Sequence, residues 1–402
     1  MRKIKYPSDR TDLESDYWNI FKDFGLQAEW VRLRNLFIGW SDSPDKEAIY
    51  PVQIRDVVCG KYDKLVDIYL DYKAIKKKKR GDSEFENLET DLFSLFSYSQ
   101  CENVYSRVFQ PLIAEFFMRH AAELELHVCH YCETAYVNAY GFSDVFRDFG
   151  CFLKNATKED IRHYIRKENG DYLSKETIKK IHDLQEIFTE DQIIEEFDKM
   201  KQWRGRKKKK SKTVFDKLRN HFDLDHFLPK SKCPIVGLSL YNFVPCCAVC
   251  NEKLKGADEL GCNEYGADDR AKWLMLSPTS DLYSFENDVT IKIDPLPSEI
   301  KIIKDADDYQ LSFSPSNSKY APVIREFMLE ERYNYHKNEA LRLHDLLVDY
   351  PKSRIKMLKS VFGGSKTERD IENDIFGVEY RQQYHRCFSK MYSDIFHTHY
   401  KK

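Results

Sequence analysis

Hydrophobic residues return at intervals of three and four positions through much of the first 125 residues. This spacing is the pattern of amphipathic helices. Thr11 and Glu14 stand at capping-box spacing before one apolar run, which predicts a helix start there. A second run, over residues 104–117, predicts another helix. We therefore expect residues 1–125 to form a mostly helical N-terminal region.

The hydrophobic pattern changes to partial alternation after residue 275. The segments DVTIKIDP, EIKIIKD and DYQLSFSP, within residues 288–315, are separated by proline, aspartate and asparagine. Alternation bounded by such residues predicts short strands of an antiparallel sheet. From Ala321 onward the apolar positions return to helical spacing, enough for about four helices. Residues 276–402 are therefore expected to form a small sheet followed by helices.

Between these regions, residues 126–275 combine paired cysteines with a polar stretch at about 143–212. Within that stretch, Thr157 and Thr189 each precede an acidic or amide residue by three positions, which predicts two helix starts. The stretch is interpreted as a helical insertion that loops out of a compact core. The fold class predicted for the whole chain is α+β, predominantly helical.

Composition sets limits on the kind of protein. The 402-residue chain is 42% hydrophobic and 32% charged, which is an ordinary globular composition that supports a large core. Basic and acidic residues number 64 and 66, so the net charge of −2 excludes a uniformly basic nucleic-acid coat but not a local basic site. The mean hydropathy is −0.63 and no apolar run reaches about 18 residues, so no membrane span is expected. The first ten residues lack the apolar stretch of a secretory signal, and a cytoplasmic location is predicted.

The chain has eleven cysteines, and an odd number makes a disulfide framework a poor explanation. Cys129 with Cys132, and Cys247 with Cys250, form two CxxC pairs. Two such turns supply the four thiolates of a closed, tetrahedral and therefore structural zinc site. Two alternatives stay open: Cys246 replaces Cys247 as a ligand, or these are buried cysteines that bind no metal.

A second group of residues has the chemistry of phosphodiester hydrolysis. The segment HFDLDHFLPKSKCP is followed by LYNFVP and CAVCNEKLKG, and together they supply a carboxylate, an imidazole and two amides. Asp225 and the amide oxygen of Asn251 are hard ligands that suit a divalent ion such as Mg²⁺. His226 suits a general base that activates water near neutral pH. Asn242 supplies the second amide.

These motifs in combination resemble the HNH (ββα-metal) nuclease superfamily, in the branch whose finger is braced by four zinc-bound cysteines. The matching pieces are CHYC, LDHFLPKSKCP, LYNFVP and CAVCNEKLKG, in two blocks at residues 125–141 and 221–256. The resemblance implies a ββα-metal core with a structural zinc, flanked by the helical N-terminal region and the C-terminal sheet and helices. It also implies the site residues: zinc at Cys129, Cys132, Cys247 and Cys250; Mg²⁺ or Mn²⁺ at Asp225 and Asn251; His226 as general base; and Asn242 orienting the His226 ring through a hydrogen bond.

The helical lead-in IAEFFMRHAAELELHVCHYC resembles that of bacterial HNH proteins from anti-phage defence loci of the Septu and retron-associated types. In those systems an HNH effector works with an ATPase. The resemblance implies a DNA endonuclease of antiviral defence, with an ATPase or another defence subunit as partner, and it is compatible with an oligomer. Two alternatives remain open: a non-catalytic zinc-finger subunit that binds nucleic acid or a partner, and an RNase that uses the same site.

Basic residues around these motifs are candidates for contacts with nucleic-acid phosphates, which would make binding dependent on salt. They are Lys230, Lys253 and Lys255 within the HNH-like segment, and Arg204 and Arg206 in a preceding run of eight basic residues with no acidic one, 201–212. A further basic run lies at 76–80. The alternative for each is an ordinary solvated surface.

Overall fold

The structure is a computed structural model, and it describes residues 1–98, 109–140, 149–165, 171–200, 219–260, 270–296, 303–377 and 386–400. These residues are mostly helical, with three two-stranded antiparallel sheets, so the predicted α+β class is confirmed. The chain divides into two compact units, Met1–Asn138 with His221–Lys402, and Ala139–Asn220. The insertion expected at about 143–212 falls inside the second unit.

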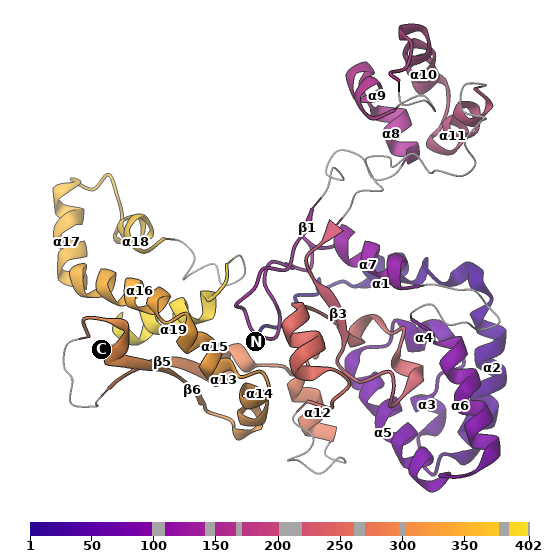
Figure 1. Cartoon of the computed structure of the whole chain (residues 1–402), viewed down its shortest axis with the longest axis horizontal. Helices are drawn as coiled ribbons and strands as arrows, with labels where there is room; N and C mark the ends of the chain where they lie inside the picture. Colours follow the sequence, from indigo (N-terminus) through magenta and orange to yellow (C-terminus); the bar gives the residue numbers. More distant parts are fainter. Residues whose placement is uncertain are drawn as a thin grey trace. The chain divides into compact units, whose positions relative to one another are not determined.

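The N-terminal part of the first unit is helical, as its hydrophobic spacing predicts (Figure 1). Its elements are α1 (Thr11–Trp18), η1 (Lys22–Phe24), α2 (Leu26–Phe37), η2 (Ile38–Trp40), α3 (Lys46–Ile49), α4 (Ile54–Val58), α5 (Tyr62–Lys78), α6 (Ser83–Leu95) and α7 (Gln110–Arg119). Thr11 is the first residue of α1 and not its cap, because the cap position is Arg10, whose backbone carbonyl accepts from the N–H of Glu14 over 2.8 Å. The start of the predicted run at 104–117 lies outside the described residues.

The central elements carry the candidate chemistry. Strand β3 (Asp223–His226) pairs antiparallel with β4 (Phe243–Cys246), and His226 lies opposite Phe243. The loop between them contains two 3₁₀ turns, η5 (Pro234–Val236) and η6 (Leu240–Asn242). After β4 the chain enters a π-helical segment, η7 (Val249–Lys255), which contacts β3 and ends at Gly256 with a positive φ of 54°. Two antiparallel strands are thus followed at once by a helical segment.

The N-terminal helices hold this central region in place. The Tyr17 hydroxyl of α1 donates to the backbone carbonyl of Leu238 over 2.9 Å, and the Ser239 hydroxyl donates to the carbonyl of Val57 over 3.0 Å. Helices α5 and α6 also pack on η5. One hydrophobic core continues from the N-terminal helices through the strands to the C-terminal elements. The loop between β3 and β4 is therefore built into the core of the first unit.

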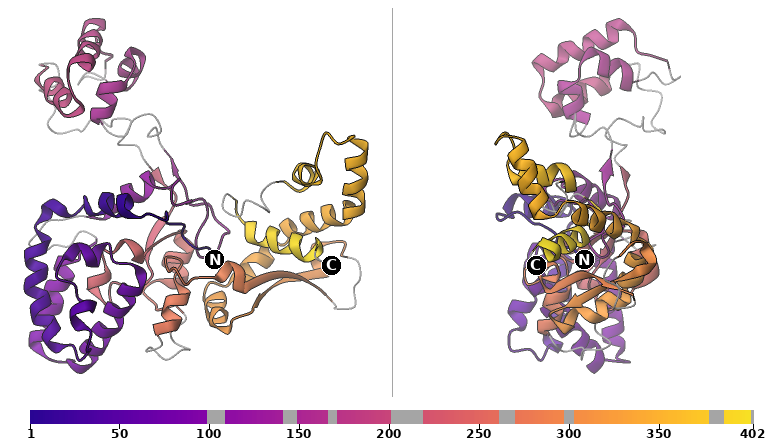
Figure 2. Two further views of the ribbon diagram at one scale, coloured as in Figure 1. Left: turned by 180° about the vertical axis from the view of Figure 1, so that it is seen from behind. Right: turned by 90° about the vertical axis from the view of Figure 1, so that its left-hand side faces the viewer.

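The C-terminal part contains two of the three expected strands. Strand β5 (Val289–Pro295) pairs along its whole length with β6 (Tyr309–Pro315). The middle segment, EIKIIKD, lies partly outside the described residues, and its described end is not a strand. Helix α19 (Ser389–Tyr400) packs on β5 (Figure 2). The Asp394 carboxylate of α19 accepts a hydrogen bond from the backbone N–H of Ile291 over 2.8 Å.

Six helices follow the sheet within the described residues, where about four were expected. They are α14 (Ala321–Glu326), α15 (Leu329–Tyr335), α16 (Asn338–Asp349), α17 (Lys352–Val361), α18 (Glu368–Phe376) and α19. The remaining elements of this part are α12 (Arg270–Leu276), α13 (Phe285–Asp288), η8 (Ala306–Asp308) and η9 (Ser318–Tyr320). None of the described helices is both long and apolar enough to cross a membrane.

The second unit is a small helical bundle (Figure 2). A short strand pair, β1 (Ala139–Tyr140) with β2 (Arg219–Asn220), lies at its two chain ends, and the helices are α8 (Phe149–Asn155), α9 (Lys158–Tyr164), α10 (Lys175–Ile187) and α11 (Glu190–Lys199). Both predicted helix starts are confirmed, because Thr157 and Thr189 form complete capping boxes. The bundle has its own hydrophobic core, separate from that of the first unit.

Candidate metal centre and catalytic site

The two CxxC pairs come together. The sulfur atoms of Cys129, Cys132, Cys247 and Cys250 all lie within 4.8 Å of one another, and the Cys132 and Cys247 sulfurs are 3.9 Å apart. A tetrahedral zinc with Zn–S bonds of about 2.3 Å requires sulfur separations of about 3.8 Å, so the cluster can bind a metal ion such as zinc. Among the described residues, no other group of three or more histidine, cysteine, aspartate or glutamate side chains has metal-binding geometry.

Hydrogen-bond donors surround the thiolates. The backbone N–H of Cys247 donates to the Cys129 sulfur over 3.3 Å, and both the backbone N–H and the hydroxyl of Thr134 approach Cys132. The guanidinium of Arg332, from α15, donates to the Cys250 sulfur over 3.2 Å. These donors favour the ionised sulfurs that metal binding needs.

Contacts among the four sulfurs shift the pKa values of their thiols in both directions. Hydrogen bonding with Cys129 lowers the pKa of the Cys247 thiol to about 7. A hydrogen bond with Cys129 also lowers the pKa of Cys132. Burial raises the pKa of Cys129, and contacts with Cys132 and Cys247 raise that of Cys250. Cys246, the alternative ligand, is fully buried next to the cluster, and burial raises the pKa of its thiol. The cluster therefore uses Cys247, as the CxxC spacing predicts.

Asp225 lies at the centre of the candidate catalytic site, and both of its carboxylate oxygens are engaged. Oδ1 accepts from the Lys255 ammonium over 3.0 Å, and Oδ2 accepts from the Tyr131 hydroxyl over 2.5 Å. The side chain is almost fully buried, and this burial raises the pKa of Asp225 despite the Lys255 ammonium. A carboxylate offers about four lone-pair positions, so about two remain for a metal ion.

His226 is held in one tautomer by its surroundings. Its Nε2 lies 2.9 Å from the carbonyl oxygen of Gly237, which can only accept, so Nε2 carries the proton and Nδ1 carries the lone pair. The ring packs against Tyr98 and Phe243, at centroid distances of 4.9 and 4.7 Å. Burial, together with the ammonium of Lys230, lowers the pKa of His226 to about 3. The imidazole is therefore neutral at pH 7 and has a free basic nitrogen.

Gly237 is a glycine because the backbone is crowded there. An added Cβ would lie 2.9 Å from the carbonyl oxygen of Pro234 and 3.0 Å from that of Phe96, and neither backbone oxygen can move aside freely. The absence of a side chain thus lets the chain bring the Gly237 carbonyl to the ring of His226.

The predicted role of Asn242 is wrong. Its side chain is fully buried, but it does not bond to the His226 ring. Its Oδ1 accepts from the backbone N–H of Leu228 over 2.8 Å, and its Nδ2 donates to the carbonyls of Leu228 and Val236, both over 3.0 Å. The three bonds use both amide hydrogens, so the amide braces the loop between β3 and β4. The backbone carbonyl of Gly237 orients the His226 ring instead.

Asn251 lies on η7 beside β3, one residue after the cluster ligand Cys250. Its Nδ2 lies 3.3 Å from Oδ2 of Asp223. Asn251 and Asp223 are both partly exposed, whereas Asp225 is buried. Because the amide nitrogen is turned to a carboxylate, the amide oxygen points elsewhere and is available as a hard-metal ligand. Asn251 thus links η7 to strand β3 at Asp223, two residues before the predicted pair of Asp225 and His226.

The candidate nucleic-acid contacts divide into three cases. Lys253 is exposed and Lys230 is partly exposed, with its ammonium 4.6 Å from the centre of the Tyr98 ring. Lys255 was wrongly expected to contact phosphate: it is 2% exposed and is paired inside the protein with Asp225. Arg204 and Arg206 lie outside the described residues.

The basic run at 76–80 belongs to the end of α5 and the turn after it. Three of its ammonium groups are paired: Lys76 with Glu89, Lys78 with Asp42, and Lys79 with Asp82. These pairs partly offset the positive charge, so the run carries no argument for a phosphate-binding surface.

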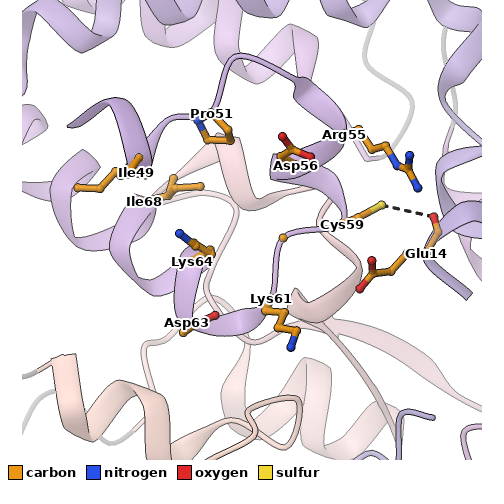
Figure 3. Close-up of a pocket in the computed structure, with 12 residues that line it drawn as sticks. Glu14, Ile49, Pro51, Arg55, Asp56, Cys59, Lys61, Asp63, Lys64 and Ile68 are labelled. Carbon is orange, nitrogen blue, oxygen red and sulfur yellow. Dashed lines mark hydrogen bonds between the residues drawn. The ribbon is translucent and has the colours of Figure 1, made fainter. Parts of the chain in front are cut away.

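A cavity of about 580 Å³ lies elsewhere, among the N-terminal helices (Figure 3). Its lining has three basic and three acidic side chains, Arg55, Lys61, Lys64, Glu14, Asp56 and Asp63. The thiol of Cys59 reaches the backbone carbonyl of Glu14 over 3.5 Å, and burial raises the pKa of this thiol to about 12. Because its charges balance, the cavity lacks the positive electrostatic potential of an anion-binding site. Because the thiol of Cys59 is protonated, the cavity also lacks a nucleophile.

Several residues of the site had not been predicted. Tyr131 stands inside the first CxxC pair, and its position next to a predicted metal ligand is the local feature of the sequence that marks it. Gly237 acts through its backbone carbonyl, and Arg332 acts from a helix that is distant in the sequence. Nothing local in the sequence marks either residue.

Comparisons with protein-family models, with curated proteins and with solved structures found no match for this chain.

Proposed function

We propose that this protein is a metal-dependent HNH endonuclease that hydrolyses phosphodiester bonds of DNA. The observation that carries the proposal is the joint placement of three side chains. Asp225 and His226 end a strand, and Asn251 lies on the helical segment that contacts this strand and begins at the cysteine cluster. A strand pair and a helix that present a carboxylate, a neutral imidazole and an amide form a suitable site for metal-assisted hydrolysis.

In this proposal the oxygen atoms of Asp225 and Asn251 would hold one Mg²⁺ or Mn²⁺ ion, with Asp223 near Asn251. Such an ion would polarise the scissile phosphate and stabilise the leaving oxygen. The chain's own base is Nδ1 of His226, which takes a proton from the attacking water. The Gly237 carbonyl keeps Nε2 protonated and so keeps Nδ1 free. Burial is the main cause of the low pKa of His226, and the ammonium of Lys230 lowers it further. A phosphate close to the ring, or bound by Lys230, would offset that ammonium and so favour the imidazolium that forms.

The four cysteines have a structural role in the proposal. A four-thiolate site leaves no open coordination position for substrate, so zinc there would order the fold and take no part in the chemistry. The predicted service in anti-phage defence and an ATPase partner rest on sequence resemblance alone and remain predictions. The cytoplasmic location rests on the composition and the first ten residues and also remains a prediction.

The test is cleavage of supercoiled plasmid by the full chain with Mg²⁺, Mn²⁺ or EDTA. The wild-type protein should nick or linearise the plasmid only with the metal. His226→Ala should abolish cleavage while it retains zinc and Mn²⁺ binding. His221→Ala, which removes an exposed histidine five residues earlier, is the matched control and should cut at the wild-type rate.

Other outcomes of this assay have definite meanings. DNA binding without metal-dependent cleavage, in the presence of candidate partner proteins as well, would favour the non-catalytic zinc-finger subunit. Cleavage of a matched RNA but not of DNA would favour the RNase alternative. Equal rates for wild type and His226→Ala would remove His226 from the mechanism.

A further inference from the structure

We propose that Tyr131 is a positioning residue that couples the four-cysteine centre to Asp225, so that order at the cysteines sets the geometry of the catalytic carboxylate. This inference rests on the proposed function insofar as Asp225 is a ligand of the catalytic metal. Tyr131 lies within the HNH-like piece CHYC, but the resemblance gives it no role; the inference adds that role and a connection between two metal sites.

The first half of the connection is the loop between Cys129 and Cys132. Tyr131 lies inside this loop, next to Cys132, and its side chain is fully buried. The ring stacks on Phe327, with centroids 4.6 Å apart and planes 21° apart. The hydroxyl donates to Oδ2 of Asp225 over 2.5 Å. Phe327 fixes one face of the ring, and the two cluster cysteines fix the backbone of Tyr131. The hydroxyl therefore has little freedom to move.

The second half comes from the other cysteine pair. Cys250 lies within η7, and Lys255 ends this segment. The Lys255 ammonium donates to Oδ1 of Asp225 over 3.0 Å and to the backbone carbonyl of His226 over 2.8 Å. Thus one oxygen of Asp225 is held from the first cysteine pair and the other from the second.

Two donors on different oxygens fix both the position and the plane of a carboxylate, and they leave its remaining lone pairs in defined directions. A metal ion at the cysteines would lock the two pairs together, and with them both donors. Outer hydrogen bonds of this kind orient a ligand before the metal binds, and their loss typically lowers metal affinity by about 10–100-fold. Metal binding at Asp225 should therefore depend on the Tyr131 hydroxyl even when the cysteine centre is intact.

Tyr333→Phe provides a matched control for Tyr131→Phe. The Tyr333 hydroxyl donates to the backbone carbonyl of Cys132 over 3.0 Å, so it is also a buried phenol at the cysteine knuckle. The hydrogen bond of Tyr333 goes to the knuckle backbone, whereas that of Tyr131 goes to Asp225. Both changes remove one oxygen atom and keep the ring, so packing is preserved.

The experiment measures Mn²⁺ binding by electron paramagnetic resonance on the zinc-loaded full chain, with zinc content and melting temperature for each variant. Tyr131→Phe should bind Mn²⁺ on the order of ten-fold more weakly than wild type with zinc unchanged. Tyr333→Phe should match wild type in both. Plasmid cleavage at subsaturating Mn²⁺ should fall with the affinity in Tyr131→Phe.

Wild-type affinity for Mn²⁺ in Tyr131→Phe would overturn the inference. So would equal losses in the two variants, or a loss of zinc in Tyr131→Phe, because either would make the effect a general weakening of the knuckle. A wild-type protein that binds no Mn²⁺ would overturn it as well. Failure of the proposed function looks different: the variants would differ in Mn²⁺ affinity as expected, but the wild type would cut neither DNA nor RNA.

Discussion

The guanidinium of Arg332 donates to the sulfur of Cys250 over 3.2 Å and to the hydroxyl of Thr134 over 3.0 Å. Four thiolates around one zinc ion carry a net charge of about −2, so a fixed cation beside them stabilises the loaded centre. Helix α15, which lies far from both cysteine pairs in the sequence, thus becomes part of their surroundings.

Replacing Arg332 by glutamine should therefore speed zinc release, on the order of ten-fold, because it removes the charge that offsets the thiolates. The measurement is the rate of zinc transfer to a coloured chelator. The rate of zinc release from Arg332→Lys should lie between those of wild type and Arg332→Gln, since lysine keeps the charge but not the two-point contact. Identical rates for Arg332→Gln and wild type would show that the hydrogen bond does not affect the centre.

The adjacent cysteines 246 and 247 should behave in opposite ways. Cys247→Ala removes a member of the cluster and should lower the zinc content and the yield of folded protein. Cys246→Ala should leave the zinc content at the wild-type level, although its side chain is fully buried. Elemental analysis of both purified variants makes the comparison. Zinc loss in Cys246→Ala but not in Cys247→Ala would show that Cys246, and not Cys247, is the fourth ligand.

Lys255 and Lys253 offer a second opposed pair, two residues apart on η7. Lys255→Met leaves the buried Asp225 carboxylate without its ammonium and should lower the free energy of unfolding by about 3–5 kcal/mol. Lys253→Met changes an exposed side chain and should shift it by less than about 0.5 kcal/mol. Chemical denaturation of the zinc-loaded proteins measures both. Equal stability would mean that Lys255 is solvated.

Gly237→Ala should reduce cleavage without loss of either metal. The added Cβ forces the loop away from the Pro234 carbonyl and carries the Gly237 carbonyl off Nε2 of His226. The imidazole then loses the contact that fixes its tautomer and orientation. Removing such a partner of a catalytic group typically costs about 10–100-fold in activity. Plasmid cleavage beside Gly39→Ala, where a Cβ meets open space, provides the control.

Glu259 provides a prediction about pH. Burial alone would raise the pKa of its carboxyl, but hydrogen bonds from Lys73 and Tyr69 hold this pKa below the ordinary 4.5. Because the folded pKa is the lower one, the contribution of Glu259 to stability is complete above pH 4.5. It disappears as the pH falls through the folded value.

Glu259→Gln should therefore be less stable than wild type at pH 7, by about 1 kcal/mol for a partly exposed charged hydrogen bond. The difference should shrink as the pH falls below 4.5. Urea denaturation of both proteins at several pH values gives the comparison. A difference that stays constant or widens in acid would contradict the assigned sign.

Local pattern predicted much of the fold. The capping boxes at Thr157 and Thr189, and the alternation of β5 and β6, depend on neighbours within a few residues, and the structure contains them. The cysteine cluster was also predictable, because metal chemistry restricts how CxxC pairs combine. The predicted cap at Thr11 is one position off, because α1 begins at Thr11 itself and Arg10 holds the cap position.

What sequence could not predict lies in long-range contacts. Lys255, in the polar segment NEKLKG, has the surroundings of a surface lysine until η7 turns it toward Asp225. The polar atoms of Asn242 matched the expected chemistry, but the choice of partner was settled by the shape of the loop between β3 and β4. Tertiary packing decides which polar groups form hydrogen bonds with one another. The residues that determine this packing are distributed over the whole chain.

The chain leaves the first unit at Asn138 and returns to it at His221, and the backbone N–H of His221 donates to the carbonyl of Asn138 over 2.9 Å. The two cysteine pairs stand on opposite sides of this junction in the sequence. An unfolded intervening segment would oppose their meeting through the entropy of closing a long loop. A bundle that folds on its own core and brings its ends together as a strand pair removes residues 139–220 from that loop, so only 133–138 and 221–246 separate the two pairs. Early folding of residues 139–220 would then accelerate assembly of the cysteine centre. The position of the insertion between the two cysteine pairs would thus favour one order of folding events.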